Sequence, residues 1–557
     1  MKLWITRLFA LSLAIGLLAS AATLAQDAPK PADPEKKTEA KDIATSTVDF
    51  EFEGLMFVQT KVNGKGPYKF LFDSGATQSV LNERLAKELG LELHDMPGGV
   101  QGVGTADAKL VVLDSMEIGG FKRGECIAAS MNLDHMSGTL GYHMMGIIGQ
   151  NVIKRMQKVE IDFSAGKLAM TRYPAGEEPS DMQEDMLIRM LKGGGGMPGM
   201  PGMPGRRQPP PDEKKPDKKD DEFSLEPVLP NAAWLLQDER RTESKPDRRS
   251  PTEGMTLTYR TGELEFFGRK MELVPYWYLD CVINGKTKSF MFDTGASMLL
   301  ALGTKLAEDV KIPTSFTYPV KGIGKGDAKS GLVDSFQVGV IKEVDAPCTI
   351  MELPKITDQL GQMGAMIPGV DKLNFDGIVG ITLATRFKKM IVDAKNRHIE
   401  FIPYGKDEVN KLEPSHSEEF VRDAVIRTWQ GKAGTFSLTG DSVQLENWKA
   451  KGLESGGLEI ESVVEGGAAH KAGLKKGDII THLVGAADDL PEDMEDADVD
   501  GKDVKVRDMP ALIMWACSKD PGTEVSVRIK RGDEVKDLKL KLDDYGFKGS
   551  VPDRFKK

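Results

Sequence analysis

Cysteine is scarce in this chain of 557 residues, which contains only Cys126, Cys281, Cys348 and Cys517. Four scattered cysteines are too few for a disulfide scaffold and have no zinc-ligand spacing. Cys126 and Cys348 fall at corresponding places in an internal repeat described below. They could be paired, but two matching buried thiols are the favoured interpretation.

Metal-binding and nucleotide-binding motifs are missing as well. The seven histidines show no HExxH or other ligand spacing, so metal chemistry has no support. No GxSxG elbow and no Walker loop occurs either. The sequence therefore predicts neither a metal ion nor a cofactor.

The chain lacks an excess of positive charge, since its formal net charge is −11. This acidity argues against a nucleic-acid partner, and no stripe of aromatic and basic residues reverses that expectation. Apolar residues make up 40% and charged residues 29% of the chain, as in ordinary soluble domains. A chain of this length is too long for one core, so two to four domains are expected.

The only long apolar run lies at the N-terminus. Two basic residues precede the apolar stretch 8–18, and three alanines between positions 21 and 25 supply small residues for cleavage. Residues 1–25 are therefore predicted to be a signal peptide, followed by a polar spacer over 26–45. A membrane anchor is the alternative, but the stretch is shorter than the roughly 20 residues that a spanning helix needs. We expect an exported protein, periplasmic or secreted, without stable membrane insertion after cleavage.

An internal repeat organises most of the chain. Residues 73–122 slide onto 293–342 without a gap, a shift of 220 positions (293 − 73). The matching stretches include FLFDSGATQSVL (70–81) with FMFDTGASMLLA (290–301), VQGVGTADAK (100–109) with VKGIGKGDAK (320–329), and GIIG (146–149) with GIVG (377–380). In both copies a lone aspartate stands inside an apolar run, where an unpaired buried charge would be costly.

Each copy is predicted to be rich in β-strands. Short apolar runs alternate with Asn-Gly and Gly-x-Gly turn signals at close intervals. The first copy is assigned to residues 46–174 and the second to 256–405. The clearest helix is LNERLAKELGL (81–91), with Asn82 as its N-cap and Gly90 at its end.

Two further segments differ in composition from the copies. Residues 175–255 contain GGGGMPGMPGMPGRRQPPP and a charged stretch, which cannot bury a core. This composition predicts a disordered linker, with a proline-rich docking site as the alternative. Residues 406–430 are interpreted as a polar connector.

The C-terminal segment 431–545 resembles a PDZ domain. The stretch GLEIESVVEGGAAHKAGLKKGDIITHLVG (457–485) has the strand, small-residue turn and short helix ending in Ala-Gly-Leu of bacterial members. The expected groove helix is PALIMWACS (510–518), the closing hairpin lies at 523–542, and GTFSL (434–438) is suggested as the carboxylate-binding loop. The resemblance implies an α+β domain that binds C-terminal peptides by strand addition.

The repeat itself resembles the retropepsin-like branch of the aspartic proteases. The family signature is an Asp-Thr/Ser-Gly triplet after apolar residues, a glycine-rich flap, and a later apolar pair before glycine. The matching residues are Asp73-Ser74-Gly75 and Asp293-Thr294-Gly295, the flap glycines Gly102, Gly104, Gly322 and Gly324, and the second-motif glycines Gly149 and Gly380. The resemblance implies a mainly β chain with two acid-protease β-barrel lobes forming a pseudo-dimer, plus the PDZ domain.

The resemblance also implies a chemistry. Asp73 and Asp293 would hold one water, with one carboxylate as general base and the other carboxyl group as acid. The hydroxyls of Ser74 and Thr294 would hydrogen-bond across the lobes, and the glycines beside them would let the backbones approach. The flaps would close over an extended substrate, although an ordinary tight hairpin is the alternative.

The sequence therefore predicts an exported aspartic endopeptidase that acts on polypeptides. The competing hypothesis is a non-catalytic peptide-binding or envelope-adaptor protein built on the same folds. The PDZ-like segment has no catalytic residue types of its own and is expected to govern substrate choice. On that view, a chain ending near Glu408 would still cut a short peptide.

Overall fold

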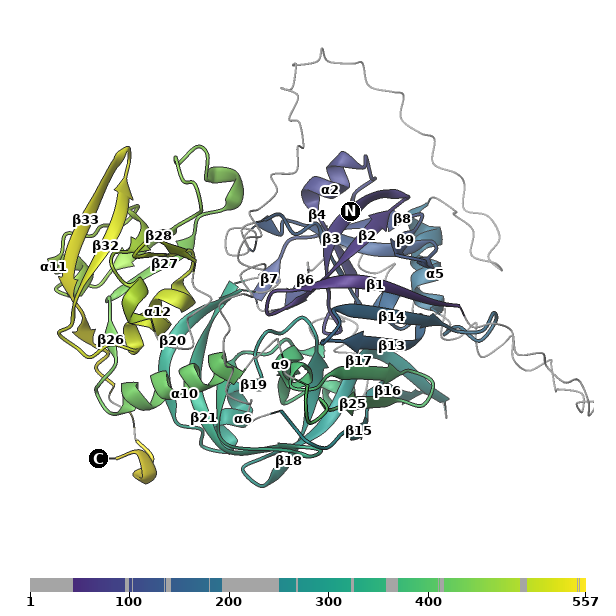
Figure 1. Cartoon of the computed structure of the whole chain (residues 1–557). Helices are drawn as coiled ribbons and strands as arrows, with labels where there is room; N and C mark the ends of the chain where they lie inside the picture. The colour runs from purple at the N-terminus through teal and green to yellow at the C-terminus, as the bar shows by residue number, and fades with distance from the viewer. Residues whose placement is uncertain are drawn as a thin grey trace, which may run out of the picture. The chain divides into compact units, whose positions relative to one another are not determined.

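The computed structural model shown in Figure 1 is mainly β, as the sequence predicted, with 47% of its described residues in strands and 17% in helices. It describes residues 44–95, 100–102, 104–134, 136, 142–179, 181–192, 250–266, 269–321, 325–356, 369–408, 410, 415–490, 498–547, 549 and 551–556. The predicted signal peptide and most of the predicted spacer and linker lie outside these residues. Of the linker, helix α5 (Met182–Leu191) is described, and the Asp181 side chain caps it by accepting from the Glu184 backbone N–H.

In its described residues, the first repeat is a succession of short strands with short helices between them. The strands are β1 (Thr45–Phe52), β2 (Met56–Val62), β3 (Lys65–Phe72), β4 (Ser79–Asn82), β5 (His94–Asp95), β6 (Val100–Gly102), β7 (Gly104–Ala106), β8 (Lys109–Leu113), β9 (Met116–Ile118), β10 (Phe121–Arg123), β11 (Cys126–Met131), β12 (Gly146–Ile148), β13 (Met156–Asp162) and β14 (Lys167–Arg172). The helices are α2 (Glu83–Glu88) and α4 (Gln150–Ile153).

The second repeat has the corresponding elements, with longer strands in its middle. The strands are β15 (Met255–Thr258), β16 (Arg260–Phe266), β17 (Arg269–Ile283), β18 (Lys286–Asp293), β19 (Leu300–Gly303), β20 (Thr314–Lys321), β21 (Lys325–Val338), β22 (Ile341–Met351), β23 (Gly377–Gly380), β24 (Lys389–Asp393) and β25 (His398–Ile402). The helical elements are α6 (Thr304–Asp309), η2 (Val370–Leu373) and α9 (Ile381–Thr385).

Asn-Gly turns begin the hairpin that leads to each aspartate. Asn63 and Gly64 between β2 and β3 both have positive φ (50° and 75°), as do Asn284 and Gly285 between β17 and β18 (48° and 77°). Two consecutive residues with positive φ make the turn that suits the twist of a two-residue hairpin. The predicted helix in the first repeat is confirmed as α2, since the Asn82 side chain accepts from the Arg84 backbone N–H.

The two repeats share one sheet. Strand β13 of the first repeat pairs antiparallel with β24 of the second, from Lys158 opposite Asp393 to Asp162 opposite Lys389. The strand order β25-β24-β13-β14-β1 therefore crosses from one repeat to the other. A single apolar core joins both repeats. All four cysteines are buried thiols, as the sequence favoured for Cys126 and Cys348.

The C-terminal module, residues 431–545, has a seven-stranded sheet and a two-stranded sheet (β26 with β34), with helices of its own. Its elements are β26 (Gly434–Thr435), β27 (Leu438–Ser442), η3 (Leu445–Asn447), β28 (Leu458–Val463), α11 (Ala468–Lys471), β29 (Ile479–Leu483), η4 (Ala487–Asp489), β30 (Val499–Asp500), β31 (Asp503–Lys505), α12 (Met509–Cys517), β32 (Glu524–Arg531), β33 (Glu534–Lys541) and β34 (Asp543–Asp544), and η6 (Asp553–Phe555) follows it. The predicted groove helix corresponds to α12, and the predicted hairpin is β32–β33 with Gly532 in its turn.

The segment interpreted as a polar connector contains helix α10 (Ser415–Trp429). This helix buries Ala424, Val425 and Trp429 in the same apolar cluster as the module core. The segment therefore contributes packed side chains as well as a connection. Within the described ranges, no helix is long and apolar enough to cross a membrane.

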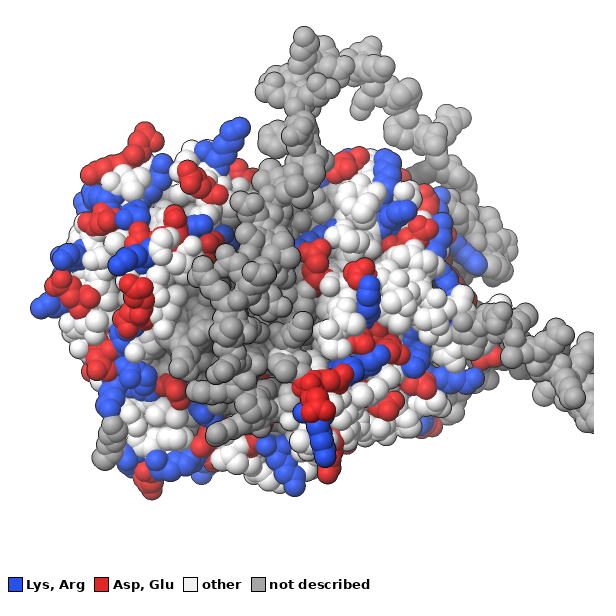
Figure 2. Space-filling view, viewed as in Figure 1, with Lys and Arg blue, Asp and Glu red and all other residues white. Residues whose placement is uncertain are grey.

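The surface visible in Figure 2 carries both signs of charge. Lys and Arg side chains lie among Asp and Glu side chains over the coloured part of this face, and neither sign forms a continuous field. Such an interspersed surface keeps a protein in solution without a strong field of one sign.

Candidate active site

The two aspartates stand at the ends of equivalent strands. Asp73 follows β3 directly, and its backbone N–H donates to the Ile148 carbonyl at 3.0 Å. Asp293 is the last residue of β18 and lies opposite Gly380 of the parallel strand β23. The apolar residues before each aspartate, such as Phe72 and Phe292, are fully buried in the core. Burial of these residues holds each carboxyl group at a defined strand end.

The carboxyl groups of Asp73 and Asp293 lie against one another's glycine loop. A Cβ atom added to Gly75 would lie 2.4 Å from Oδ2 of Asp293, and one added to Gly295 would lie 2.4 Å from Cγ of Asp73. No side chain fits at either position, because real Cβ atoms do not approach other atoms so closely. The predicted role of the two glycines in close approach is therefore supported by the geometry.

Backbone amides hold the carboxylates in place. Oδ1 of Asp73 accepts from the N–H groups of Gly75 (2.7 Å) and Ala76 (3.1 Å), and Oδ1 of Asp293 accepts from Gly295 (2.7 Å). The Gly75 N–H also stabilises the Asp293 carboxylate. These donors favour the ionised form of a carboxyl group.

Burial raises the pKa of both aspartates, and the charge of Asp293 raises that of Asp73 further. The pKa of Asp73 is well above its ordinary value, because burial, the charge of Asp293 and a hydrogen bond to Asp293 all favour the protonated form. Burial also raises the pKa of Asp293, but the hydrogen bond from Asp73 and the Gly295 and Gly75 amides oppose this rise. Two carboxyl groups this close cannot both ionise readily, so the pair shares one proton.

The hydroxyl residues beside the aspartates connect the two repeats. The Ser74 N–H donates to Oγ1 of Thr294 (2.9 Å), and that hydroxyl donates to the Phe72 carbonyl (2.9 Å). Reciprocally, the Thr294 N–H donates to Oγ of Ser74 (3.0 Å), and that hydroxyl donates to the Phe292 carbonyl (3.1 Å). Both residues are completely buried, so the four hydrogen bonds fix one loop against the other.

The second-motif glycines are required by close backbone contacts. A Cβ atom on Gly149 would lie 2.5 Å from the Gln78 carbonyl carbon, and one on Gly380 would lie 1.9 Å from the Met298 carbonyl oxygen. Each glycine therefore packs directly behind the loop that carries the aspartate of its own repeat.

The predicted flaps are described only in part. In the first repeat, β6 and β7 form an antiparallel hairpin with Gly102 opposite Gly104. In the second repeat, β20 and β21 pair up to Lys321 opposite Lys325, and Gly322 and Gly324 lie outside the described residues. The first pair of glycines therefore lies at a hairpin end.

Gln150 is a site residue that the sequence reasoning missed. Its buried side-chain amide donates to the Ser74 carbonyl at 3.0 Å, and its backbone N–H donates to the Ala76 carbonyl at 2.8 Å. The repeat gave no signal for the side chain, because Ile381 occupies the equivalent position and supplies only its backbone N–H to the Ala296 carbonyl. Gln150 thus stabilises only the first of the two loops through its side chain.

Apolar clusters flank the aspartate pair in both repeats. In the first repeat the cluster includes Leu71, Ala76 and Ile147. In the second repeat, the site-side cluster comprises Val274, Tyr276, Tyr278, Met291, Ala296, Ala301, Ala328, Met351, Ile356, Val370, Leu373, Phe375 and Ile378. Two carboxyl groups with one proton in such surroundings can take a proton from a water and give one to a carbonyl oxygen.

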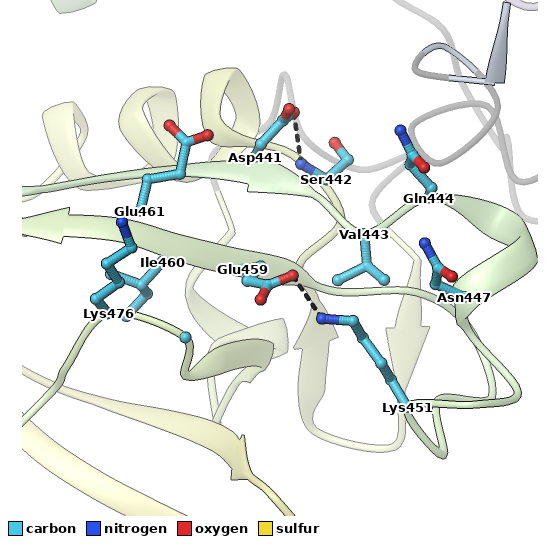
Figure 3. Close-up of a pocket in the computed structure, with 11 residues that line it drawn as sticks. Asp441, Ser442, Val443, Gln444, Asn447, Lys451, Glu459, Ile460, Glu461 and Lys476 are labelled. Carbon is cyan, nitrogen blue, oxygen red and sulfur yellow. Dashed lines mark hydrogen bonds and ion pairs between the residues drawn. The ribbon is translucent and has the colours of Figure 1, made fainter. Parts of the chain in front are cut away.

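The described residues include no group of three or more His, Cys, Asp or Glu side chains that could hold a metal ion. An open pocket of about 400 Å³ lies in the C-terminal module and is lined by residues between Asp441 and Gly477. Figure 3 shows Lys451 of this pocket in an ion pair with Glu459, and Lys476 and Glu461 also line the pocket. The pocket carries both charge signs and neither aspartate of the pair lines it.

Comparison with known proteins places a family match on each repeat. Residues 58–152 and 279–383 match the aspartyl protease family, which supports a protease-type function. Each match contains one aspartate of the pair and its second-motif glycine. None of the curated protein sequences matches the chain.

Solved structures with some likeness include three proteins with low sequence identity. A retropepsin-like aspartic protease from Rickettsia conorii has 19% identity over 24% of this chain and 92% of its own, with a TM-score of 0.18. The retroviral protease-like domain of Ddi1 from Leishmania major has 21% identity over 22% and 97%, with a TM-score of 0.16. Basic 7S globulin from soybean has 8% identity over 65% and 95%, with a TM-score of 0.25. Such TM-scores carry no conclusion about the function of this chain.

Proposed function

We propose that this chain is an exported aspartic endopeptidase in which Asp73 and Asp293 together activate a water. Its two repeats would act as the lobes of a single-chain pseudo-dimer. One observation carries the proposal: the carboxyl group of each aspartate lies directly against the glycine of the other repeat's Asp-hydroxyl-Gly triplet. The Ser74–Thr294 hydrogen bonds support it, because they hold both loops in this arrangement.

The shared proton suggests an order of proton transfers in which Asp293 is the ionised member, because the Gly295 and Gly75 amides and the hydrogen bond from Asp73 favour its carboxylate. Ionised Asp293 takes a proton from the water while the water oxygen attacks the carbonyl carbon of the scissile peptide bond. Asp73 gives its proton to the carbonyl oxygen, which produces a neutral tetrahedral diol. The proton on Asp293 then moves to the amide nitrogen, and a diol proton returns to Asp73 as the C–N bond breaks. Both aspartates end in their starting states.

The C-terminal module is proposed to be a PDZ domain that binds C-terminal peptides of substrates or partners. Strand β27 lies at an edge of the module sheet, beside β28, and α12 is the helix that the resemblance assigns to the groove. An edge strand can pair with an added peptide strand. Export to the periplasm or outside the cell is proposed from the N-terminal sequence alone, and polypeptides would be the substrates.

Hydrolysis of unfolded casein by the purified chain tests the proposal. We expect cleavage that pepstatin inhibits and that either Asp73→Asn or Asp293→Asn reduces by several orders of magnitude, with the double variant scarcely worse. Asp107→Asn is the matched control, because it removes an exposed aspartate of the first repeat. A wild-type chain that cuts no unfolded protein between about pH 3 and 8 would favour the non-catalytic peptide-binding protein.

A further inference from the structure

The second repeat contributes side chains to the apolar core of the C-terminal module. Phe316 of β20 and Leu332 of β21 are buried in one cluster with Leu512, Trp515 and other residues of the module. The Phe316 ring also lies 6.0 Å from the ring of Tyr545, between centroids. Burial of shared apolar surface means that the module packs on the second repeat instead of being tethered to it.

Helix α10 strengthens this contact at the start of β20. The Trp429 indole N–H donates to the Thr314 carbonyl at 3.0 Å. Strand β20 is the edge of its sheet, so this carbonyl has no ladder partner on its outer side. The helix and the module therefore cover an edge strand that would otherwise expose backbone groups.

Tyr318 links the covered strand to the candidate active site. Its ring packs against the module cluster on one side and against the site-side cluster on the other. The second of these clusters contains Met291, two residues before Asp293, and Ala296, three residues after it. The Tyr318 hydroxyl shares a hydrogen bond of 2.7 Å with Thr349, which limits rotation of the ring.

The first repeat differs at the equivalent positions. Under the shift of 220 residues, Phe316 and Tyr318 correspond to Met96 and Gly98, so both rings are absent there. Leu332 corresponds to Val112, which is partly exposed, whereas Leu332 is completely buried. The apolar side chains that meet the module are therefore specific to the second repeat.

We propose that Phe316, Tyr318 and Leu332 are positioning residues through which the C-terminal module holds the second-repeat wall of the active site. This inference rests on the proposed proteolytic function and extends it, because the module becomes part of the catalytic unit. It replaces the expectation that the module only selects substrates. A chain that ends near Glu408 would lose this support together with α10.

The first measurement uses hydrogen exchange in the full chain carrying Asp73→Asn, so that self-cleavage cannot interfere. In this background we compare Leu332→Ala with Val112→Ala, its matched control in the first repeat. We expect amides of β20 and β21 to exchange on the order of tenfold faster with Leu332→Ala and to stay unchanged with Val112→Ala. Trp429→Phe is a milder variant that keeps an aromatic ring and removes the hydrogen bond to Thr314, and it should act in the same direction.

The second measurement uses the active chain and a peptide long enough to fill the cleft. Leu332→Ala should raise KM on the order of tenfold and change kcat much less, because a displaced wall weakens substrate binding. A merely destabilising change would lower the amount of active enzyme and leave KM unaltered. Ile480→Ala, which opens a cavity within the module sheet, controls for loss of module stability.

The two measurements separate this inference from the proposed function. If the wild-type chain cuts nothing, the proteolytic function fails, and hydrogen exchange still decides whether the module supports β20. Unchanged exchange of β20 in both Leu332→Ala and Trp429→Phe would overturn the inference. A KM equal to that of wild type in Leu332→Ala would overturn it as well.

Discussion

At the scale of single residues, the candidate site depends on pairs that neither repeat can complete alone. Each aspartate is surrounded by its own loop amides and by the carboxyl group of the other repeat. A lone buried carboxylate would be costly, whereas two that share a proton carry one charge between them. The aspartate in each apolar run is therefore explained by the second copy.

The raised pKa of Asp73 predicts how stability depends on pH. An unfolded aspartate titrates near 3.9, so the folded chain binds more protons above that pH and loses stability as pH rises toward the folded pKa. Asp73→Asn removes this loss, because asparagine keeps the shape and carries no charge. We expect the difference in Tm between the variant and wild type to grow in favour of the variant as the pH is raised from about 3 to 7.

Thermal unfolding at three pH values across that range measures this difference, with Asp107→Asn as the exposed control. A Tm difference that stays constant over the range, or one that increases as pH falls, would contradict the assignment of the raised pKa.

The Ser74–Thr294 network predicts a large effect for a small change. Thr294→Val keeps the volume but removes the acceptor of the Ser74 N–H and the donor to the Phe72 carbonyl. Two buried backbone groups lose their partners, so the free energy of unfolding should fall by about 2–4 kcal/mol. Urea unfolding checks this value. Thr294→Ser retains the hydroxyl and should cost much less; equal losses in the two variants would assign the effect to packing.

At the scale of elements, local turn and cap chemistry agrees with the fold. Asn63 and Asn284 occupy positive φ in equivalent turns. The Asn63 side-chain oxygen accepts from the Ser115 backbone N–H, and that of Asn284 accepts from the Ser335 backbone N–H. Helix α10 is the exception, because its polar sequence concealed a role in packing. Its burial against the module core follows from one apolar stripe, which includes Val425 and Trp429.

A buried ion network attaches α10 to the second repeat. Arg386, which directly follows α9, is almost fully buried and pairs with Glu418 of α10 and Glu343 of β22. Removal of one partner from a buried network leaves an uncompensated charge. Arg386→Leu should therefore reduce the free energy of unfolding by about 3–5 kcal/mol.

Glu343→Gln is the matched comparison, because the Glu343 side chain is 22% exposed against 6% for Glu418. Because solvent screens the interaction of this more exposed carboxylate, the free energy of unfolding should fall by only about 1 kcal/mol or less in Glu343→Gln. Chemical denaturation of both variants gives the two values. A similar, small loss for Arg386→Leu would show that the network is replaceable by apolar packing.

At the scale of the whole molecule, the two repeats form one folded unit. They share the β13–β24 pairing, one apolar core and the hydrogen bonds between the aspartate loops. All of these contacts lie within a single chain. On the proposed function, one chain would supply both aspartates of the pair.

This arrangement predicts the outcome of mixing inactive chains. An equimolar mixture of Asp73→Asn and Asp293→Asn chains should show no more casein hydrolysis than either variant alone, because exchange of repeats would require separating the shared sheet. Co-refolding of the two variants from urea provides the sensitive form of the measurement. Recovery of a substantial fraction of wild-type activity after mixing without denaturant would show that the repeats pair between chains.

The repeat, the mainly β class and the two aspartates of the candidate site could be predicted from the amino-acid sequence alone. These features depend on local chemistry and on a duplicated pattern. Turns with positive φ favour Asn or Gly, and the start of a helix favours a capping residue. The two Asp-hydroxyl-Gly triplets stand 220 positions apart (293 − 73) in matching sequences. The sequence also indicated α12 and the hairpin β32–β33 of the C-terminal module. In each case the signal lies within a few neighbouring residues.

Which surfaces pack together could not be predicted from the sequence and is seen only in the tertiary structure. Gln150 donates to the Ser74 carbonyl, Arg386 pairs with Glu418, and Phe316 packs in the module core. None of these residues lies in a sequence pattern from which its partner could be predicted. The physical reason is that burial is non-directional: an apolar or polar side chain shows that it needs a partner, but the partner is set by chain geometry far away in sequence. The protonation of the aspartate pair also depends on tertiary structure, because the two carboxyl groups share a proton only when the fold brings them together.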